Sequence, residues 1–318
     1  MLAPRAGGDT WTNRADMPTA RSGHSTCVAN GRIYAIGGAV DDNAATSAVE
    51  EYDPSTNTWT KKTKMPTVRG YMATCTVNGK IYAMGGNSPN GSFSNLEKYD
   101  PETDTWTKKT NIPIKMNHFT ACAVNGKIYA FGGWNGGNAV ESVVYEYDPA
   151  TDTWTRKADM PTGRAACGSA VVNDKIYIIG GTLPPAWTQP GITTVEEYDP
   201  ATDTWTKKAD MLTPRYHFAA SALDGKIYVF SGENVPGDGK LVSTVEEYDP
   251  ATDTWIQRSD PPTERRQHSS SVVGGKIYIV GGLSGVVYQS LVEEYIPGSV
   301  SVEARGKLPT TWGEVRSD

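Results

Sequence analysis

Short apolar segments bounded by turn residues recur along almost the whole chain. The segment Ile33–Ile36 reads Ile-Tyr-Ala-Ile and is followed by two glycines, and Ile176–Ile179 ends in the same way. Apolar runs of four or five residues bounded by Gly, Asn, Asp or Pro are typical of β-strands, since helices need longer segments with a different period. The pattern therefore predicts an all-β protein.

The strands belong to a repeat that tryptophan marks. Six tryptophans are separated by 48, 47, 48, 51 and 50 residues: Trp11, Trp59, Trp106, Trp154, Trp205 and Trp255. Each repeat contains four predicted strands, here named a to d. Strand a follows a Pro-x-x-Arg start in most copies, b ends in a double glycine, c reads Val-Glu-Glu-Tyr or similar, and d begins with the tryptophan.

The connections between these strands have the composition of tight turns. Asn30-Gly31 and Asn78-Gly79 lie between strands a and b, and such pairs favour two-residue hairpins because both positions need positive φ. Strands c and d are joined by Asp-Pro-x-Thr-Asp-Thr-Trp, as in Asp148–Trp154, which suits a type I turn. The acidic ring of these turns also suggests calcium, but the turn chemistry explains it without a metal.

Four short strands form a sheet that cannot bury both of its faces alone. Arranging the copies around an axis buries the faces and leaves only short outer edges. The paired glycines suit a close approach of neighbouring backbone, and the lysines of strand d suit an outer edge that resists strand addition. We therefore predict a six-bladed β-propeller made of four-stranded antiparallel blades.

The order of double glycine, tyrosine and tryptophan resembles the Kelch repeat. The resemblance covers the chain from about Thr10 to Pro297. It implies a propeller over residues 10–302, an N-terminal extension over 1–9 and a tail over 303–318. The sixth unit lacks its own tryptophan, so we predict that the strand around Trp11 closes the last blade, with Val300–Lys307 as the rival.

The resemblance implies a binding module, because Kelch propellers mostly bind proteins and a minority act on small molecules. It places the ligand on the d–a and b–c loops. One expected ring is the start of strand a, where Met116 replaces arginine in the third copy: Arg21, Arg69, Arg164, Arg215 and Arg265. These guanidinium groups suit a carboxylate, phosphate or acidic peptide, or else a structural role between blades.

A second expected ring varies strongly between copies, and such variation can determine specificity. It is the residue after each double glycine: Ala39, Asn87, Trp134, Thr182, Glu233 and Leu283. Trp134 and Trp187 are aromatic residues of the b–c loops, suited to sugar stacking or to anchoring a protein, or else to covering the blade tops. Together with the arginines, Asn87, Trp134, Glu233, Tyr216 and Trp187 are the expected ligand-binding residues.

The fifth copy suggests an enzymatic alternative. Ser231-Gly232 replaces the double glycine there, Glu233 follows, and Arg215, Tyr216 and His217 start strand a. A carboxylate, a histidine and arginines at one mouth can hold an anionic sugar and move a proton. This resembles what sialic-acid mutarotases, which are six-bladed Kelch enzymes, require. Glu233, His217 and Arg215 are the catalytic candidates of this alternative.

Composition restricts the remaining classes. The 318-residue chain has a net charge of −6, which predicts binding neither to nucleic acid nor to membranes. It shows no signal peptide and no CxxC pair, and its histidines fall in two registers that point to opposite faces. We expect no cofactor, no metal, buried free cysteines and a monomer that binds a protein, a peptide or an anionic glycan.

The compartment stays open between secreted and cytoplasmic, and the uniform repeats also allow an engineered or recently duplicated scaffold.

Overall fold

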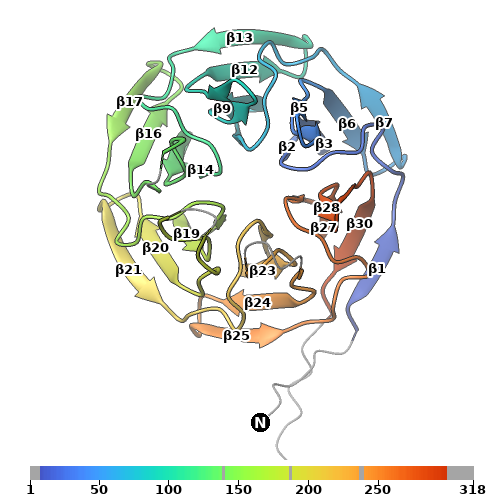
Figure 1. The fold of residues 1–318 in the computed structure, drawn as a ribbon, viewed down its shortest axis with the longest axis vertical. Helices are drawn as coiled ribbons and strands as arrows, with labels where there is room; N and C mark the ends of the chain where they lie inside the picture. Colours follow the sequence, from blue (N-terminus) through green and yellow to red (C-terminus); the bar gives the residue numbers. More distant parts are fainter. Residues whose placement is uncertain (1–7, 138–139, 186–187, 236–239, 299–318) are drawn as a thin grey trace, which may run out of the picture.

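The computed structural model describes residues 8–137, 140–185, 188–235 and 240–298. It is an all-β protein whose strands form six four-stranded antiparallel sheets arranged around one axis (Figure 1). The six-bladed propeller predicted from the repeat is therefore confirmed. No helix among these residues is long and apolar enough to cross a membrane.

Each blade runs from an innermost strand a to an outermost strand d. The first two blades are β2 (Ser25–Ala29), β3 (Arg32–Ile36), β6 (Val49–Asp53) and β7 (Thr58–Lys61), then β8 (Ala73–Val77), β9 (Lys80–Met84), β12 (Leu96–Asp100) and β13 (Thr105–Lys109). The next two are β14 (Thr120–Val124), β15 (Lys127–Phe131), β16 (Val144–Asp148) and β17 (Thr153–Arg156), then β18 (Gly168–Val172), β19 (Lys175–Ile179), β20 (Val195–Asp199) and β21 (Thr204–Lys208). The fifth is β22 (Ala219–Leu223), β23 (Lys226–Phe230), β24 (Val245–Asp249) and β25 (Thr254–Gln257), and the sixth contains β26 (Ser269–Val273), β27 (Lys276–Val280) and β30 (Val292–Ile296).

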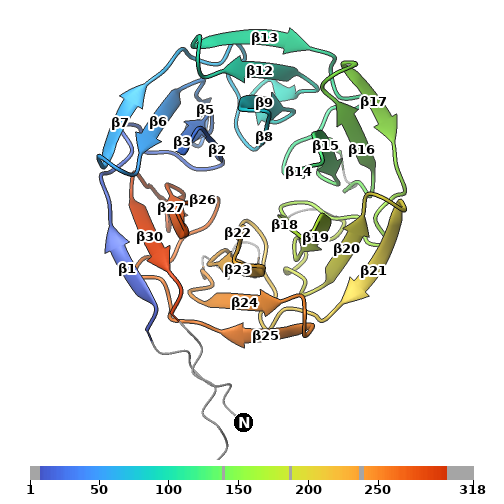
Figure 2. The ribbon, with the colours of Figure 1, turned by 180° about the vertical axis from the view of Figure 1, so that it is seen from behind.

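The fourth strand of blade six comes from the other end of the chain. Strand β1 (Thr10–Asn13) pairs with β30, and Trp11 lies opposite Tyr295 (Figure 2). The prediction that the N-terminal strand closes the last blade is thus confirmed. Asp9, which was expected to belong to an N-terminal extension, is fully buried and accepts hydrogen bonds from the backbone N–H groups of Ser259 (2.9 Å) and Gly298 (2.8 Å).

Neighbouring blades are joined near the axis by backbone hydrogen bonds. The second glycine of each pair donates to the carbonyl at the Arg position of the next blade, as Gly38 does to Arg69 at 3.0 Å, and the same bond recurs in all six blades. A Cβ atom on Gly37 would lie 2.5 Å from the Arg69 carbonyl oxygen, and one on Gly38 would lie 2.7 Å from that of Ser22. The first glycine is therefore closely approached by the next blade and the second by its own blade, although Ser231 takes the first position in blade five with a φ of +50°.

The outer strands are tied to the preceding blade by tryptophan. The indole N–H of Trp59 donates to the Ala15 carbonyl at 2.9 Å, and Trp106 donates to that of Thr63 at 3.0 Å. The apolar core lies between the blades, where each cluster combines residues of two adjacent sheets, such as Ile36 with Ile81. In five blades the tryptophan thus contributes both packing and an inter-blade hydrogen bond, whereas in blade six Trp11 packs in the core without such a bond.

The antiparallel order places the b–c and d–a connections on one face and the a–b and c–d turns on the other. We call the first the loop face. Three of its b–c loops contain small hairpins: β4 (Ala39–Asp41) with β5 (Ala44–Ala45), β10 (Asn87–Ser88) with β11 (Gly91–Ser92), and β28 (Leu283–Ser284) with β29 (Val287–Tyr288). The arrangement gathers all the variable loops around one mouth of the central axis.

Candidate functional site

A closed ring of backbone hydrogen bonds surrounds the axis at the mouth of the loop face. The residue two places after the Arg position of each blade donates its N–H to the same residue of the neighbouring blade, over 2.6–3.0 Å. Every member has a φ between +50° and +56°. The ring consists of Gly23, Tyr71, His118, Ala166, His217 and Gln267. This ring fixes the six backbones that carry the side chains of the mouth.

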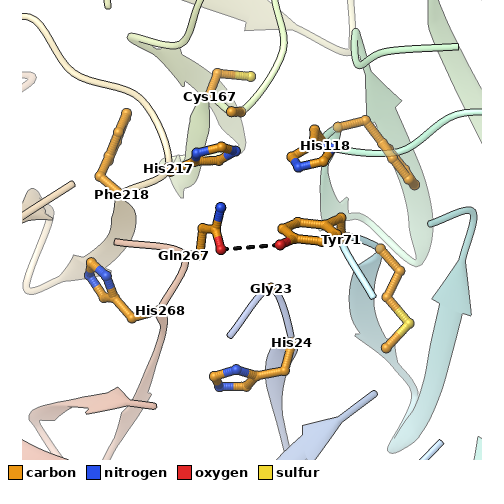
Figure 3. Close-up of a pocket in the computed structure, with 12 residues that line it drawn as sticks. Gly23, His24, Tyr71, His118, Cys167, His217, Phe218, Gln267 and His268 are labelled. Carbon is orange, nitrogen blue, oxygen red and sulfur yellow. Dashed lines mark hydrogen bonds between the residues drawn. The ribbon is translucent and has the colours of Figure 1, made fainter. Parts of the chain in front are cut away.

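Four of these side chains meet at the axis (Figure 3). The rings of Tyr71 and His118 stack with centroids 4.2 Å apart, and His217 lies 5.1 Å from His118. The Tyr71 hydroxyl donates to the Gln267 side-chain oxygen at 3.1 Å. The small residues Gly23 and Ala166 complete a pocket of about 120 Å³ with them. The mouth is therefore polar and aromatic, and it is narrow.

Glu233 connects this ring to the surrounding loops. Its backbone pairs with that of Tyr216, and one carboxylate oxygen lies 2.7 Å from Nδ1 of His217. The other oxygen accepts a hydrogen bond from Arg266 at 2.6 Å. Tyr216 and Glu233 are buried. The structure thus brings together the predicted Glu233, Tyr216 and His217, and adds Arg266, His118, Tyr71 and Gln267.

The electrostatics of the mouth favour an ionised Glu233 and a neutral His118. Burial by itself raises the pKa of Glu233, but the hydrogen bond from His217 and the charge of Arg266 outweigh it, so the pKa lies below its usual value. Burial, with a smaller contribution from the charge of His217, lowers the pKa of His118 well below the usual value. At neutral pH the mouth therefore presents a carboxylate that is already paired on both oxygens.

His24 and His268 lie one residue further along strand a than the axial histidines. They line the same pocket, but Figure 3 shows them farther from its centre. Burial lowers the pKa of His268 to about 3, with the charge of Arg265 adding to the effect. Burial, Arg21 and His268 lower that of His24 well below its usual value. The four histidines therefore lie at two distances from the pocket centre, and all four line the same pocket although their registers were expected to point to opposite faces.

The five arginines expected around the mouth lie in the interior instead. Each is at most 1% exposed and pairs with the first glutamate of strand c in its own blade. Arg21 lies 2.9 Å from Glu50 and also donates to the carbonyls of Gly37, Ala48 and Ala35. The other pairs are Arg69–Glu97 at 3.0 Å, Arg164–Glu196, Arg215–Glu246 and Arg265–Glu293. The scaffold interpretation of these arginines accounts for every partner they have.

Blade three lacks the buried arginine–glutamate pair. Met116 replaces the arginine there, and Tyr145 replaces the glutamate of strand c. Both are buried in the same cluster. An exchange of both partners for apolar residues is what a structural ion pair requires, because either charge alone would be buried without compensation. This paired exchange was present in the sequence as a signal against a ligand role.

The remaining predicted residues lie on the loop face. Asn87 and Trp134 pair through their backbones with Gly70 and Asn117 of their own blades, and both side chains are partly buried. Trp187 lies outside the described residues. No group of three or more His, Cys, Asp or Glu side chains suited to a metal ion occurs in the described part of the chain. All four cysteines are free and buried, as expected.

A second and larger cleft opens beside the axial pocket. It has a volume of about 460 Å³ and lies between the b–c hairpins of blades one, two and six. Tyr71 belongs to the walls of both cavities. Sequence reasoning did not find this cleft, because Asp41, Asp42 and Tyr288 come from loops more than two hundred residues apart.

Comparison with known proteins identifies the architecture. Residues 9–181 match the model of the KLHDC2/KLHL20/DRC7 Kelch-repeats domain, and residues 163–212, 214–262 and 264–299 match the Kelch motif. The chain belongs to the Kelch-repeat family. A solved structure titled "Structure of YjhT" superposes with a TM-score of 0.75 at 18% identity, covering 89% of this chain and 96% of the other. No curated protein matches the sequence.

The buried ion pairs predict a non-additive pair of substitutions. Arg69→Met leaves Glu97 buried without its cation, so we expect a loss of about 3–5 kcal/mol in the free energy of unfolding. Arg69→Met/Glu97→Tyr copies blade three and should recover most of that loss. Urea denaturation of the two variants and of Glu97→Tyr measures the coupling. Equal stability of the single and double variants would contradict the structural role.

The inner histidines predict a loss of stability in acid. A histidine that stays neutral in the folded state but is protonated when unfolded destabilises the fold as pH falls below about 6.5, until its folded pKa is reached. The variant His24→Met/His268→Phe introduces the residues that stand at the equivalent positions of blades two and five. We expect its free energy of unfolding to decrease less than that of wild type between about pH 6 and pH 4. Urea midpoints across this range test it. A parallel pH profile for wild type and variant would show that these histidines do not cause it.

Proposed function

We propose that this protein is a binding module that holds a protein or peptide partner on the loop face. The observation that carries the proposal is the distribution of exposed large apolar side chains. All five among the described residues lie on b–c or d–a connections: Val68, Leu212, Val235, Val286 and Val287. Because the opposite face carries none of these side chains among the described residues, the loop face is the better candidate for an interaction surface, and the adjacent Val286 and Val287 are its most exposed apolar pair.

The architecture supports this proposal. Kelch propellers in general are scaffolds that mediate protein interactions. Here the rigid part is continuous, since two rings of backbone hydrogen bonds and the buried ion pairs hold the strands. The loops therefore project from a fixed base, and this lowers the entropic cost of ordering the protein when a partner binds.

A display library of random peptides tests the proposal. We expect peptides selected on the immobilised protein to lose affinity about tenfold or more in Val286→Ser/Val287→Ser, because truncating an apolar anchor removes a central contact. Ala150→Ser, an exposed apolar-to-polar change on the opposite face, is the matched control. Fluorescence polarisation measures the affinities. Peptides that are sensitive only to the control, or no selected peptide at all, would refute the proposal.

The second candidate function is a small-molecule isomerase of the sialic-acid mutarotase type. It is favoured by one observation, the pairing of Glu233 with His217 and Arg266 at the mouth. Two features weigh against it. The axial pocket measures only about 120 Å³, and both oxygens of Glu233 are already hydrogen-bonded.

Anomeric exchange of N-acetylneuraminic acid, followed by proton NMR, tests this candidate. If it holds, the protein accelerates exchange above the buffer rate, and Glu233→Gln and His217→Phe each lower the acceleration by about 10² or more, the usual loss for a general acid–base group. Arg156→Lys, an exposed change far from the mouth, should leave it unaltered. Exchange at the buffer rate in wild type would eliminate the candidate.

A further inference from the structure

The cleft beside the axial pocket is built by three hairpins. Strands β4 and β5 supply Asp41 and the turn that carries Asp42, β10 supplies Asn87 and Ser88, and β29 ends in Tyr288. Tyr71 forms the wall toward the axis. These residues come from blades one, two and six, so the cleft exists only because the closure of the ring joins the last blade to the first.

Two carboxylates at this cleft lack a cationic partner. Asp41 and Asp42 are exposed, and neither takes part in an ion pair formed by the described residues. Asp41 accepts a hydrogen bond from the Asn43 N–H at 2.8 Å, and Asp42 accepts one from the Tyr288 hydroxyl at 3.0 Å. Since elsewhere in this protein most acidic side chains are paired within their own blade, the charge of this hairpin is available to a ligand.

The aromatic walls favour the same kind of ligand. Burial raises the pKa of both tyrosines, and the hydrogen bond to Asp42 adds to the effect at Tyr288. Both side chains therefore stay neutral, and the ring of Tyr71 is held in place by its stacking on His118. Aromatic rings combined with carboxylates attract an ammonium or guanidinium group both by cation–π interaction and by charge-assisted hydrogen bonds.

Two apolar residues directly precede Tyr288, which lines the cleft. Val286 and Val287 form the tip of the hairpin whose β29 strand carries Tyr288, and they are 88% and 59% exposed. A free amine or metal ion would leave these valines unused, and the described residues contain no metal-binding cluster. A peptide that carries a basic side chain and a neighbouring apolar one would use both.

We propose that this cleft, lined by Asp41, Asp42, Tyr71 and Tyr288, receives an arginine or lysine side chain of the partner's peptide segment, while Val286 and Val287 hold an adjacent apolar side chain. The inference rests on the proposed function and specifies its partner as a basic and apolar peptide. The guanidinium groups of the sequence had suggested a carboxylate, phosphate or acidic peptide instead. The interior position of those arginines removes the cations that an acidic ligand would need.

The test uses five sets of acetylated hexapeptides with randomised flanks and one fixed central residue, namely arginine, lysine, citrulline, leucine or glutamate. We expect the full-length protein to retain the arginine and lysine sets at least tenfold better than the other three. Asp41→Asn/Asp42→Asn, which keeps both hydrogen-bond acceptors, should remove this preference. Asp210→Asn/Asp260→Asn removes the same charge from exposed d–a positions of the same face and is the matched control.

The outcomes separate the two proposals. The protein could retain all five sets to the same extent, with retention lowered by Val286→Ser/Val287→Ser but unchanged by the Asp41/Asp42 variant. This result overturns the basic-residue inference and leaves the binding function intact. If the Asp210/Asp260 control also removes the preference for arginine and lysine, the preference is an effect of net charge, and the inference is overturned. Retention of no set would refute both the inference and the proposed function.

Discussion

The close approach of neighbouring blades at the double glycines is the constraint on which the rest of this structure depends. It lets the N–H of Gly38 reach the Arg69 carbonyl, and five equivalent bonds complete the circle. Two residues after each of these carbonyl-bearing Arg positions the chain turns with positive φ. The backbones of these turning residues form the second ring of hydrogen bonds at the mouth. The position of every side chain around the axis follows from these two rings.

The buried arginines serve the same architecture. Each guanidinium group joins strand c to the carbonyls around the double glycine of its blade, as Arg164 does through Glu196, Gly180 and Thr194. Such a pair contributes little net stability over an apolar one but is costly to break on one side only. Its substitution by Met116 and Tyr145 in blade three shows that the scaffold accepts either solution, provided that both partners change together.

The scaffold is nearly the same in every blade, and the loops of one face are what varies. The a–b and c–d turns repeat nearly the same residues in each blade, whereas the b–c loops differ in length, charge and exposed apolar surface. Asp42 of the first hairpin and Tyr288 of the sixth meet only because β1 joins β30 and brings the ends of the chain together. A rigid ring with one differentiated face is an architecture suited to binding, which is the function proposed for this protein.

The sequence by itself determined the fold of this protein. A repeat of about fifty residues with fixed turn chemistry has a local signal in every copy. For the closure of the last blade the sequence favoured the strand around Trp11 over Val300–Lys307, and the pairing of β1 with β30 confirms that choice. It also placed Glu233, Tyr216 and His217 near one another, because their positions in one repeat fix their distance. The sequence held one signal that Arg21 and its equivalents are structural, the joint exchange of Met116 and Tyr145, but the tertiary structure decided that they face inward, since the facing of a strand-end residue depends on the sheet packed against it. It alone placed Asp42 beside Tyr288, because no local pattern records which loops meet when a ring closes.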